Sequence, residues 1–356
     1  MTAGMDMKVG IIGCGGIAPM HLRVYKRLEG VEVAGLCDLN PERVKNLAER
    51  FGVKKTYSDY QEMFEKENLD LVDICTPVST HLRIVCDAAE TTPAILVEKP
   101  MALNVGECDE MIRTVEKHGR KLCIGHNQIF SPHIQKAKSM VNSGGFKLHS
   151  FRTTLKANFE NLKAYKLAPP WNVSPQQRGI IWEVCCHHAY LHLHLLCDID
   201  EVYAVGSRLK YPVYDDFAVL LRTKEDHFGI IEISWVQRET EVVYELKDSA
   251  GRRVQILWEY DYMLENSMDP PFTVGLVAKN IYVDHKRLLQ KWVKFGTCYI
   301  RKRKLLPTAT MIATYIEAIK KDQPPPVTPI DGRRTINLLE CIDRSLNERR
   351  PVQLDR

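Results

Sequence analysis

The chain has 356 residues, of which 45% are hydrophobic and 26% charged, with a formal net charge of +4 at pH 7. This balance is typical of a globular protein and excludes a disordered chain, and the modest charge does not indicate nucleic-acid binding. No apolar run reaches the roughly 18 residues of a membrane span. Because single hydrophobic cores rarely grow beyond about 250–300 residues, the length predicts two domains.

Residues 1–7 contain neither a basic nor an apolar leader segment, so we expect no secretory signal and a cytoplasmic protein. The eleven cysteines include no CxxC pair, and we expect them to be reduced, buried thiols. Residues 286–304 hold eight basic residues and no acidic one, with aromatic residues between them. We expect a solvated face or an oligomer edge there, with an anionic substrate group or an anionic membrane surface as the alternatives.

The first motif is a glycine-rich turn between an expected strand and an expected helix. The sequence GCGGIA at residues 13–18 follows the apolar run 9–12. In this context Gly13 permits a tight turn, Gly15 lets the backbone approach a pyrophosphate, and the helix N-terminus faces the phosphates. Asp38 follows the next strand, at the spacing of an acid that binds ribose hydroxyls. The cofactor-binding residues expected here are Gly13, Gly15, Gly16, Ile17 and Asp38.

The acid also bears on the choice of cofactor. Asp38 favours NAD because its charge would repel a 2′-phosphate, while nearby Asn40 and Arg43 leave NADP possible. The alternative is an ordinary βαβ turn that uses glycine only for its backbone freedom. That alternative leaves Asp38 unexplained.

The N-terminal part alternates short β-rich runs with helix-length segments, which predicts a doubly wound parallel sheet. We therefore expect a Rossmann domain over residues 1–125. Its expected strands are 8–13, 31–37, 71–75, 94–98 and 121–125, and its expected helices are 17–28, 41–51, 59–66, 80–89 and 104–118.

After Gly125 longer alternating strands follow, which predict a second α/β domain over residues 126–356, built on a large, open, mainly antiparallel sheet. The expected strands are 146–157, 201–210, 215–223, 227–236, 241–248 and 252–258, and the C-terminal helices are 308–321 and 331–348. Because an open sheet has unpaired edges and an exposed face, we expect a homodimer or homotetramer.

Polar residues follow two of the buried strands. Ligands bind at the carboxyl ends of strands in open parallel sheets, so Thr76, Pro77 and His81 after one strand should contact the cofactor. Glu98 and Lys99 end the next strand at the same edge, where Lys99 would place a cation beside the nicotinamide. The following Pro100 predicts a cis bond.

A second cluster occurs at residues 179–194. If this segment is helical, Glu183 and His187 share a face, and the carboxylate can orient an imidazole suited to proton transfer. A metal site is the alternative, since the segment also holds Cys185, Cys186 and three further histidines. Adjacent pairs point to different faces of a helix, so we expect no metal and expect His188, His192 and His194 to pack in a core or interface.

These motifs resemble the Gfo/Idh/MocA family, which includes glucose-fructose oxidoreductase and inositol dehydrogenase, over nearly the whole chain. The similar segments are 13–18 (GCGGIA), 37–43 (CDLNPER), 73–77 (DICTP) with His81, 97–103 (VEKPMAL), and the closing segment 331–352. The resemblance implies a Rossmann domain, an α/β domain whose open sheet mediates oligomerisation, and hydride transfer between NAD(P) and a sugar, cyclitol or related carbinol.

The resemblance also implies roles for single residues. Lys99 would bond the reacting oxygen, and Glu183 with His187 would form the family's Asp-x-x-x-His pair, with His187 as general acid/base. The substrate-binding residues would be His126, Asn127, Lys99 and His187. The chain departs from the family pattern at Glu183 (usually Asp), Cys185 (usually Gly), Tyr190 (commonly Asp) and Ile129 (often Arg).

The sequence thus predicts an NAD(H)-dependent sugar, cyclitol or nucleotide-sugar dehydrogenase. Two other functions remain open. One is a regulatory protein that binds NAD without turnover, which the altered positions suggest. The other is a redox-neutral enzyme that holds NAD tightly and acts through a keto-sugar intermediate.

Overall fold

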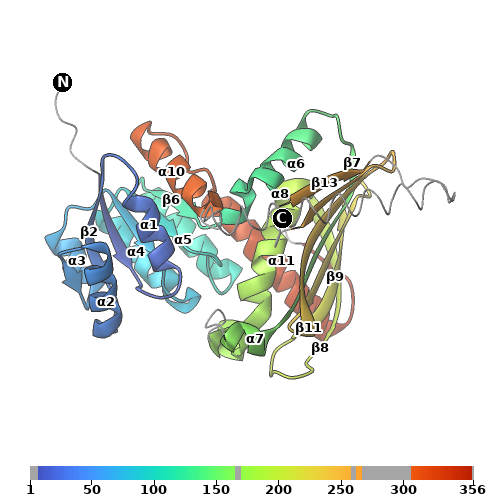
Figure 1. Cartoon of the computed structure of the whole chain (residues 1–356), viewed down its shortest axis with the longest axis horizontal. Coiled ribbons are helices and arrows are strands. Elements are labelled where there is room, and N and C mark those ends of the chain that lie inside the picture. The colour runs from blue at the N-terminus through green and yellow to red at the C-terminus, as the bar shows by residue number, and fades with distance from the viewer. Residues whose placement is uncertain (1–6, 165–169, 258–261, 267–305, 355–356) are drawn as a thin grey trace, which may run out of the picture. The chain divides into compact units, whose positions relative to one another are not determined.

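The computed structural model describes residues 7–164, 170–257, 262–266 and 306–354. The chain forms two compact units (Figure 1). Unit 1 comprises residues 1–130, 169–190 and 307–343, and unit 2 comprises residues 131–168, 191–306 and 344–356. The basic stretch at residues 286–304 lies outside the described residues.

Unit 1 contains a six-stranded sheet in the order β3-β2-β1-β4-β5-β6, in which all neighbours run parallel. All residues of β4 and β5 are buried, as expected for strands covered by helices on both faces. The strand order reverses at β1, and ligands bind outside the carboxyl ends of strands at such a point. The strands are β1 (Met7–Ile12), β2 (Val31–Cys37), β3 (Thr56–Tyr57), β4 (Leu71–Ile74), β5 (Ala94–Val97) and β6 (Lys121–Ile124).

Side-chain caps define the start of three crossover helices. The oxygens of Asn40, Asp59 and Asn104 accept hydrogen bonds from backbone N–H groups in the first turns of the helices they precede. Such caps satisfy donors that have no partner inside the helix. The crossover helices are α1 (Ala18–Tyr25), α2 (Pro41–Phe51), α3 (Tyr60–Lys66), α4 (His81–Thr91) and α5 (Val105–Lys117).

Two C-terminal helices, α10 (Leu306–Lys320) and α11 (Pro329–Glu348), return to unit 1 for part of their length. The buried hydroxyl of Tyr315 in α10 donates to the carbonyls of Ile95 and Lys121, at the starts of β5 and β6. Arg333 in α11 pairs with Asp109 in α5. These contacts explain why unit 1 extends beyond the N-terminal part of the sequence.

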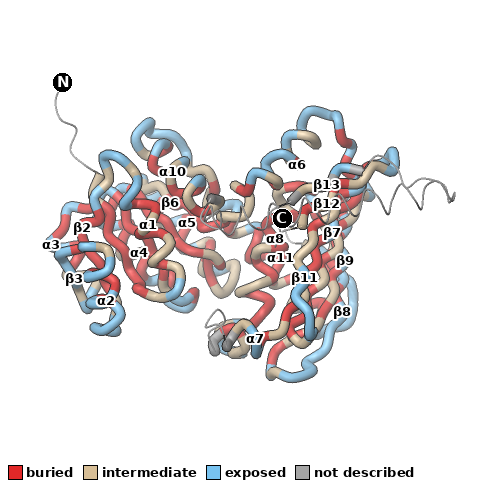
Figure 2. The backbone as a smooth tube through the Cα atoms, in the orientation of Figure 1, coloured by how far each residue is buried: buried red, intermediate tan, exposed pale blue. Residues whose placement is uncertain are grey.

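Unit 2 contains an eight-stranded sheet in the order β13-β12-β11-β7-β10-β9-β8-β14, antiparallel except between β7 and β10. Figure 2 shows buried residues along the strands of both sheets. The strands are β7 (Leu148–Asn158), β8 (Ile199–Ser207), β9 (Asp216–Thr223), β10 (Phe228–Ser234), β11 (Val236–Asp248), β12 (Arg253–Leu257), β13 (Tyr262–Asn266) and β14 (Val352–Gln353). In sequence, α6 (Pro132–Asn142) lies between β6 and β7, and α7 (Phe159–Ala164) and α8 (Cys186–Leu196) lie between β7 and β8. A π-helical turn, Ile181–Cys185, precedes α8.

The C-terminal part of α8 packs on one face of this sheet. His192 is fully buried, its Nε2 lies 3.1 Å from the carbonyl of Phe151, and a Cβ on Gly229 in β10 would lie 2.6 Å from its ring. His192 is therefore a core residue, as expected. Exposed Tyr203 and Leu220 face each other across β8 and β9.

The predicted α/β class, the parallel sheet and the mainly antiparallel second sheet are confirmed. The predicted strands and helices correspond to observed elements, whereas α6, α7, β13 and the two-residue strands β3 and β14 were not predicted. The two short strands contain too few residues for an alternating pattern. The expected boundary at residue 125 lies close to the end of the first segment of unit 1, but unit 1 also includes residues 169–190 and 307–343.

Candidate active site

The glycine-rich turn has the form that a dinucleotide requires. Gly13 has φ +94°, and a Cβ there would lie 2.7 Å from the carbonyl group of Cys75, so only glycine fits. A Cβ on Gly15 or Gly16 would meet no atom within 4 Å. The N-cap of α1, Ile17, offers no side-chain hydrogen bond to the first turn. Open space beside an uncapped helix N-terminus fits a pyrophosphate.

Asp38 lies directly after β2 and contacts this turn. Its Oδ2 accepts a hydrogen bond of 2.7 Å from the Cys14 N–H, and its Oδ1 accepts one of 2.8 Å from the Asn40 N–H. A carboxylate has about four acceptor sites, so two remain for ribose hydroxyls. Asp38 therefore fits NAD and also stabilises the turn that the cofactor would contact.

Two residues predicted to touch the cofactor face the protein instead. His81 is buried, with Nε2 2.9 Å from the Thr76 carbonyl oxygen and Nδ1 3.0 Å from that of Pro100. It connects the loops after β4 and β5, and burial lowers its pKa. Glu98 points toward His21 in the interior. Direct cofactor contact by these two side chains is thus corrected to a supporting position, because backbone and imidazole partners occupy them.

Thr76 and Pro77 lie at the expected edge, after β4. The Thr76 hydroxyl accepts a hydrogen bond from Thr80, and Pro77 is exposed. The Lys99–Pro100 bond is cis, as predicted.

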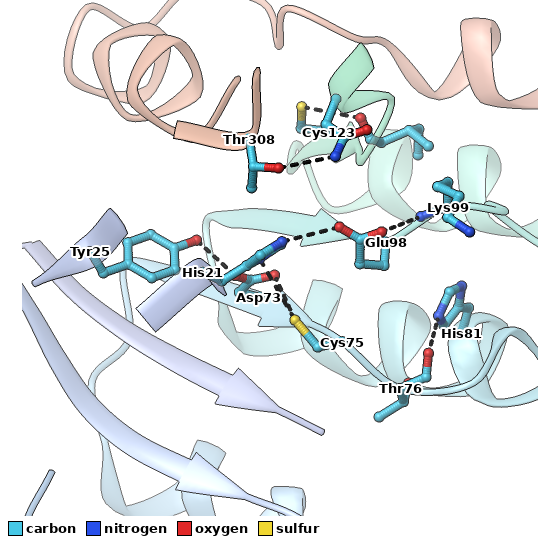
Figure 3. A network of polar contacts seen from close by, with 12 residues as sticks. His21, Tyr25, Asp73, Cys75, Thr76, His81, Glu98, Lys99, Cys123 and Thr308 are labelled. Atoms are coloured by element: carbon cyan, nitrogen blue, oxygen red, sulfur yellow. Dashed lines mark hydrogen bonds and ion pairs between the residues drawn. The ribbon is translucent and has the colours of Figure 1, made fainter. Parts of the chain in front are cut away.

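A buried ionic network lies behind this edge (Figure 3). The imidazole of His21 is fully buried between two carboxylates, with Nδ1 2.7 Å from Asp73 Oδ2 and Nε2 3.1 Å from Glu98 Oε1. The Tyr25 hydroxyl also donates to Asp73, at 2.9 Å. Burial alone would lower the pKa of His21, but the charge of Asp73 raises it well above 6.5. His21 is therefore a buried imidazolium. Burial alone would raise the pKa of Glu98, but the hydrogen bond and the charge of His21 outweigh burial and lower it.

The network ends at the lysine. The second carboxylate oxygen of Glu98 accepts a hydrogen bond from the Lys99 N–H at 3.2 Å. The Lys99 side chain lies away from this network, and its Nζ donates to Glu183 Oε1 at 2.8 Å and to the Glu183 carbonyl at 3.0 Å. Burial opposes the charge of Lys99, but Glu183 outweighs it and raises the Lys99 pKa above 10.5. Lys99 is thus a fixed ammonium group.

The expected Glu183–His187 pair does not form. Within the described residues, Glu183 bonds Lys99, and Nδ1 of His187 lies 2.8 Å from the hydroxyl of Tyr190, three residues further along α8. The nearby ammonium group is the stronger partner for the carboxylate. Burial and then the charge of Lys99 lower the pKa of His187 well below 6.5. His187 is therefore neutral at pH 7, and the charge of Lys99 contributes to the lowering of its pKa.

The residues predicted to bind substrate lie around Tyr190. His126 is buried and stacks on the Tyr190 ring, with centroids 4.3 Å apart. Asn127 accepts a bond of 3.4 Å from the Tyr190 hydroxyl and donates one of 3.0 Å to Thr308. His126, Asn127, Lys99 and His187 thus belong to one unit and one neighbourhood.

Three residues that take part in the site or in the network behind it were not predicted from the sequence. His21 follows the glycine turn by one helical turn, and Thr308 comes from α10, far along the chain. Tyr190 was noted only as a departure from a pattern, although its position three residues after His187 indicates a shared helix face.

Among the described residues, one group of potential metal ligands comes together: His21, Asp73 and Cys75, with ligand atoms within 4.8 Å of one another. All three are buried and bonded to each other, and His21 also faces Glu98. Residues 185–194 contribute no such group in this part of the chain.

A turn that fits a pyrophosphate, an acid for the ribose, and a lysine near a neutral histidine are the requirements of a dinucleotide-dependent oxidoreductase. Residues 7–126 match "Oxidoreductase family, NAD-binding Rossmann fold", and residues 134–256 match "GFO/IDH/MocA C-terminal domain". The chain belongs to the Gfo/Idh/MocA family of NAD-binding oxidoreductases, as its motifs predicted.

Relatives extend over the whole chain. Myo-inositol 2-dehydrogenase of Thermotoga maritima is 26% identical, over 98% of this chain and 99% of that protein. D-apiose dehydrogenase of Paraburkholderia graminis is 26% identical over 74% and 70% of the two chains. The solved structure of WlbA dehydrogenase from Bordetella pertussis, in complex with NADH and UDP-GlcNAcA, has the same fold, with a TM-score of 0.80 at 18% identity and coverage of 99% and 98%.

Proposed function

We propose that this protein is an NAD(H)-dependent dehydrogenase that oxidises a secondary carbinol of a sugar, cyclitol or nucleotide-sugar, or reduces the matching ketone. The observation that carries the proposal is the placement of a permanently charged Lys99 close to a neutral His187 in the NAD-binding unit. The names of relatives, inositol and apiose dehydrogenases, support the substrate class.

His187 would act as the base. Its Nε2 has no hydrogen-bond partner among the described residues, and its side chain is partly exposed. It can therefore accept the hydroxyl proton of a carbinol. A neutral imidazole is the form in which histidine accepts a proton, and such catalysis contributes about 10²–10⁴-fold.

Lys99 would stabilise the charge that develops on the substrate oxygen. Two of its ammonium protons are directed to Glu183, which leaves the third for that oxygen. Because Glu183 holds Lys99 in one position, the donor is oriented before the reaction begins. NAD, when bound, supplies the hydride acceptor.

The carboxylate of Asp38 supports a preference for NAD over NADP, and Gly15 and Gly16 would lie against the pyrophosphate. Among the described helices, none has the length and apolar character needed to cross a membrane. Ten described cysteines are free thiols, which supports a reducing cytoplasm as the location. The exposed Tyr203 and Leu220 on the sheet of unit 2 support a homodimer or homotetramer.

The first experiment identifies nucleotide released from the purified protein by absorbance and mass, and titrates NAD(H) and NADP(H). Gly15→Val should lower NAD affinity at least about tenfold, or 1.4 kcal/mol, because the added side chain occupies the open space of the turn. Gly145→Val, at an exposed glycine of unit 2, is the control. Equal affinity of all three proteins would contradict this cofactor site.

The second experiment follows NADH formation with myo-inositol, apiose and a panel of sugars and nucleotide-sugars. Turnover that disappears in His187→Asn supports the proposal. NAD that copurifies and is not consumed during substrate conversion would indicate the redox-neutral alternative. Binding of NAD with no conversion of any substrate would favour a regulatory protein.

A further inference from the structure

Trp182 directly precedes Glu183 in the π-helical turn Ile181–Cys185, and its contacts lead to an inference that rests on the proposed function and deepens it. We propose that Trp182 is a positioning residue that fixes this turn to the loop between β5 and α5, and so holds Glu183 where it orients Lys99. Trp182 is 1% exposed, so it acts through Glu183 and not through contact with a ligand.

Two adjacent residues of the turn bond the same loop. The Nε1–H of Trp182 donates to the carbonyl oxygen of Ala102 at 3.1 Å, and the roles are unambiguous because an indole N–H can only donate. The carboxylate and the carbonyl of Glu183 accept from Nζ of Lys99 at 2.8 Å and 3.0 Å. Lys99 and Ala102 are three residues apart in this loop. The bond from Trp182 therefore sets how closely Glu183 approaches Lys99.

The loop itself is held by the helices that pack on it. Met101 and Ala102 are fully buried. Nδ1 of His81, at the start of α4, lies 3.2 Å from the Met101 carbonyl oxygen. A Cβ on Gly332 in α11 would lie 2.6 Å from the Met101 sulfur, so the helix backbone packs closely against this side chain. The Ala102 carbonyl is thus a fixed acceptor, and the bond from Trp182 transfers this fixed position to the turn.

The turn depends on such contacts from outside, because π-helical geometry is rare and the chain before it is strained. Arg178 has φ +60°, a left-handed conformation that residues with a Cβ seldom adopt. Its guanidinium carbon lies 4.7 Å from the centroid of the Trp182 ring, and its Nη1 lies 3.3 Å from Asp343 in α11. The Trp182 side chain is therefore held at two points, at its ring by Arg178 and at its N–H by Ala102.

The direct test measures how firmly Lys99 is held. Lysine amines of the full-length protein are trace-labelled with acetic anhydride, which reacts only with the unprotonated amine, and mass spectrometry gives the labelling rate of each lysine. Lys121 is the internal reference, because its environment resembles that of Lys99. Its Nζ pairs with the carboxylate of Asp322 at 2.9 Å and donates to the carbonyl of Gln323 at 3.0 Å.

Trp182→Phe keeps an aromatic ring beside Arg178 and deletes the indole N–H. The labelling rate of Lys99 relative to Lys121 should rise about threefold to tenfold, because a buried ammonium group less firmly paired with Glu183 has a lower pKa. A role confined to packing would lower the melting temperature and leave this ratio as in the wild type. An unchanged ratio would overturn the proposal.

Trp235→Phe is the matched control. Trp235 is also a buried indole, 4% exposed, but its Nε1 has no hydrogen-bond partner in the part of the chain that the structure describes. It should leave the labelling ratio unchanged, and an equal rise in both variants would reject the proposal. If Trp182→Phe does not fold, Arg178→Ala, at an exposed residue, takes its place. It should raise the ratio by a smaller factor, and an unchanged ratio would overturn the proposal.

A kinetic test uses a substrate found by the panel. Trp182→Phe should lower kcat about tenfold to a hundredfold and change KM less than about twofold, because the donor on Lys99 is displaced while binding contacts remain. Equal kcat values in Trp182→Phe and Trp235→Phe would reject the proposal. The labelling needs neither cofactor nor substrate. A protein that binds no NAD would therefore contradict the proposed function without deciding how Lys99 is held, and the two failures are distinguishable.

Discussion

Two histidines of unit 1 show opposite electrostatic behaviour. His21 lies between the carboxylates of Asp73 and Glu98, and its pKa is raised well above 6.5. His187 bonds a neutral phenol, lies near an ammonium group, and has a pKa well below 6.5. Burial lowers the pKa of both, so the charge of the neighbouring groups decides the outcome. A permanent charge suits a structural anchor, whereas a neutral ring suits proton transfer.

The sharpest test of this difference removes the neutral histidine. His187→Asn should lower kcat by about 10²–10⁴-fold, because it deletes the base, and should leave NAD affinity and the melting temperature close to those of the wild type. Steady-state kinetics, cofactor titration and thermal unfolding measure these quantities. Turnover within about threefold of the wild type would remove His187 from the mechanism.

Removal of the charged histidine should affect stability instead. His21→Gln leaves Asp73 and Glu98 without their shared cation and should lower the free energy of unfolding by about 3–5 kcal/mol. Because the raised His21 pKa stabilises the fold fully below 6.5, this contribution declines as pH rises through the folded-state pKa. The lowered Glu98 pKa stabilises the fold above 4.5, and this contribution declines as pH falls through its folded-state pKa.

The difference between wild type and His21→Gln should therefore be largest from pH 4.5 to 6.5 and smaller on both sides. Denaturant unfolding at several pH values measures it. A difference that does not change with pH would mean that His21 is held as a neutral group.

Lys99 connects the two regions, since its backbone bonds Glu98 and its side chain acts on His187. Lys99→Met should lower kcat about 10²–10³-fold through loss of the donor to the developing charge. The removed cation should also raise the His187 pKa, so the acid limb of the pH profile, or the NMR titration of His187, should move to higher pH. An unchanged His187 titration would mean that the charge of Lys99 does not act on His187.

The smallest expected effects are the stability losses on removing a hydroxyl that bonds a charged acceptor or one that bonds uncharged acceptors. Tyr25→Phe deletes a hydrogen bond to the Asp73 carboxylate and should cost about 1.5–3 kcal/mol of stability. Tyr315→Phe deletes bonds to backbone carbonyls and should cost about 0.5–1.5 kcal/mol per bond. Denaturant unfolding at pH 7 compares the two variants, and a smaller cost for Tyr25→Phe would contradict the ionic character of the His21 network.

Local sequence was sufficient for the Rossmann sheet, its helices, the glycine turn and the position of Lys99 after β5. These features depend on short-range patterns: buried apolar runs, capping residues, and the need for glycine at positive φ. The same reasoning located His187 but assigned its partner incorrectly, because a spacing of four residues describes which side chains share a face and not which of several neighbours a carboxylate will bond.

The sequence by itself determined the two kinds of sheet, the NAD-binding turn and the residues that carry the chemistry. Only the tertiary structure decided their pairing: Lys99 with Glu183, His187 with Tyr190, and His21 with Asp73 and Glu98. The physical reason is that Lys99 and Glu183 are 84 residues apart, and that among near neighbours such as His187 and Tyr190 the choice of partner depends on the other groups that the fold brings to them. Their protonation depends on burial and charge at distances of a few ångströms, which a linear pattern does not record.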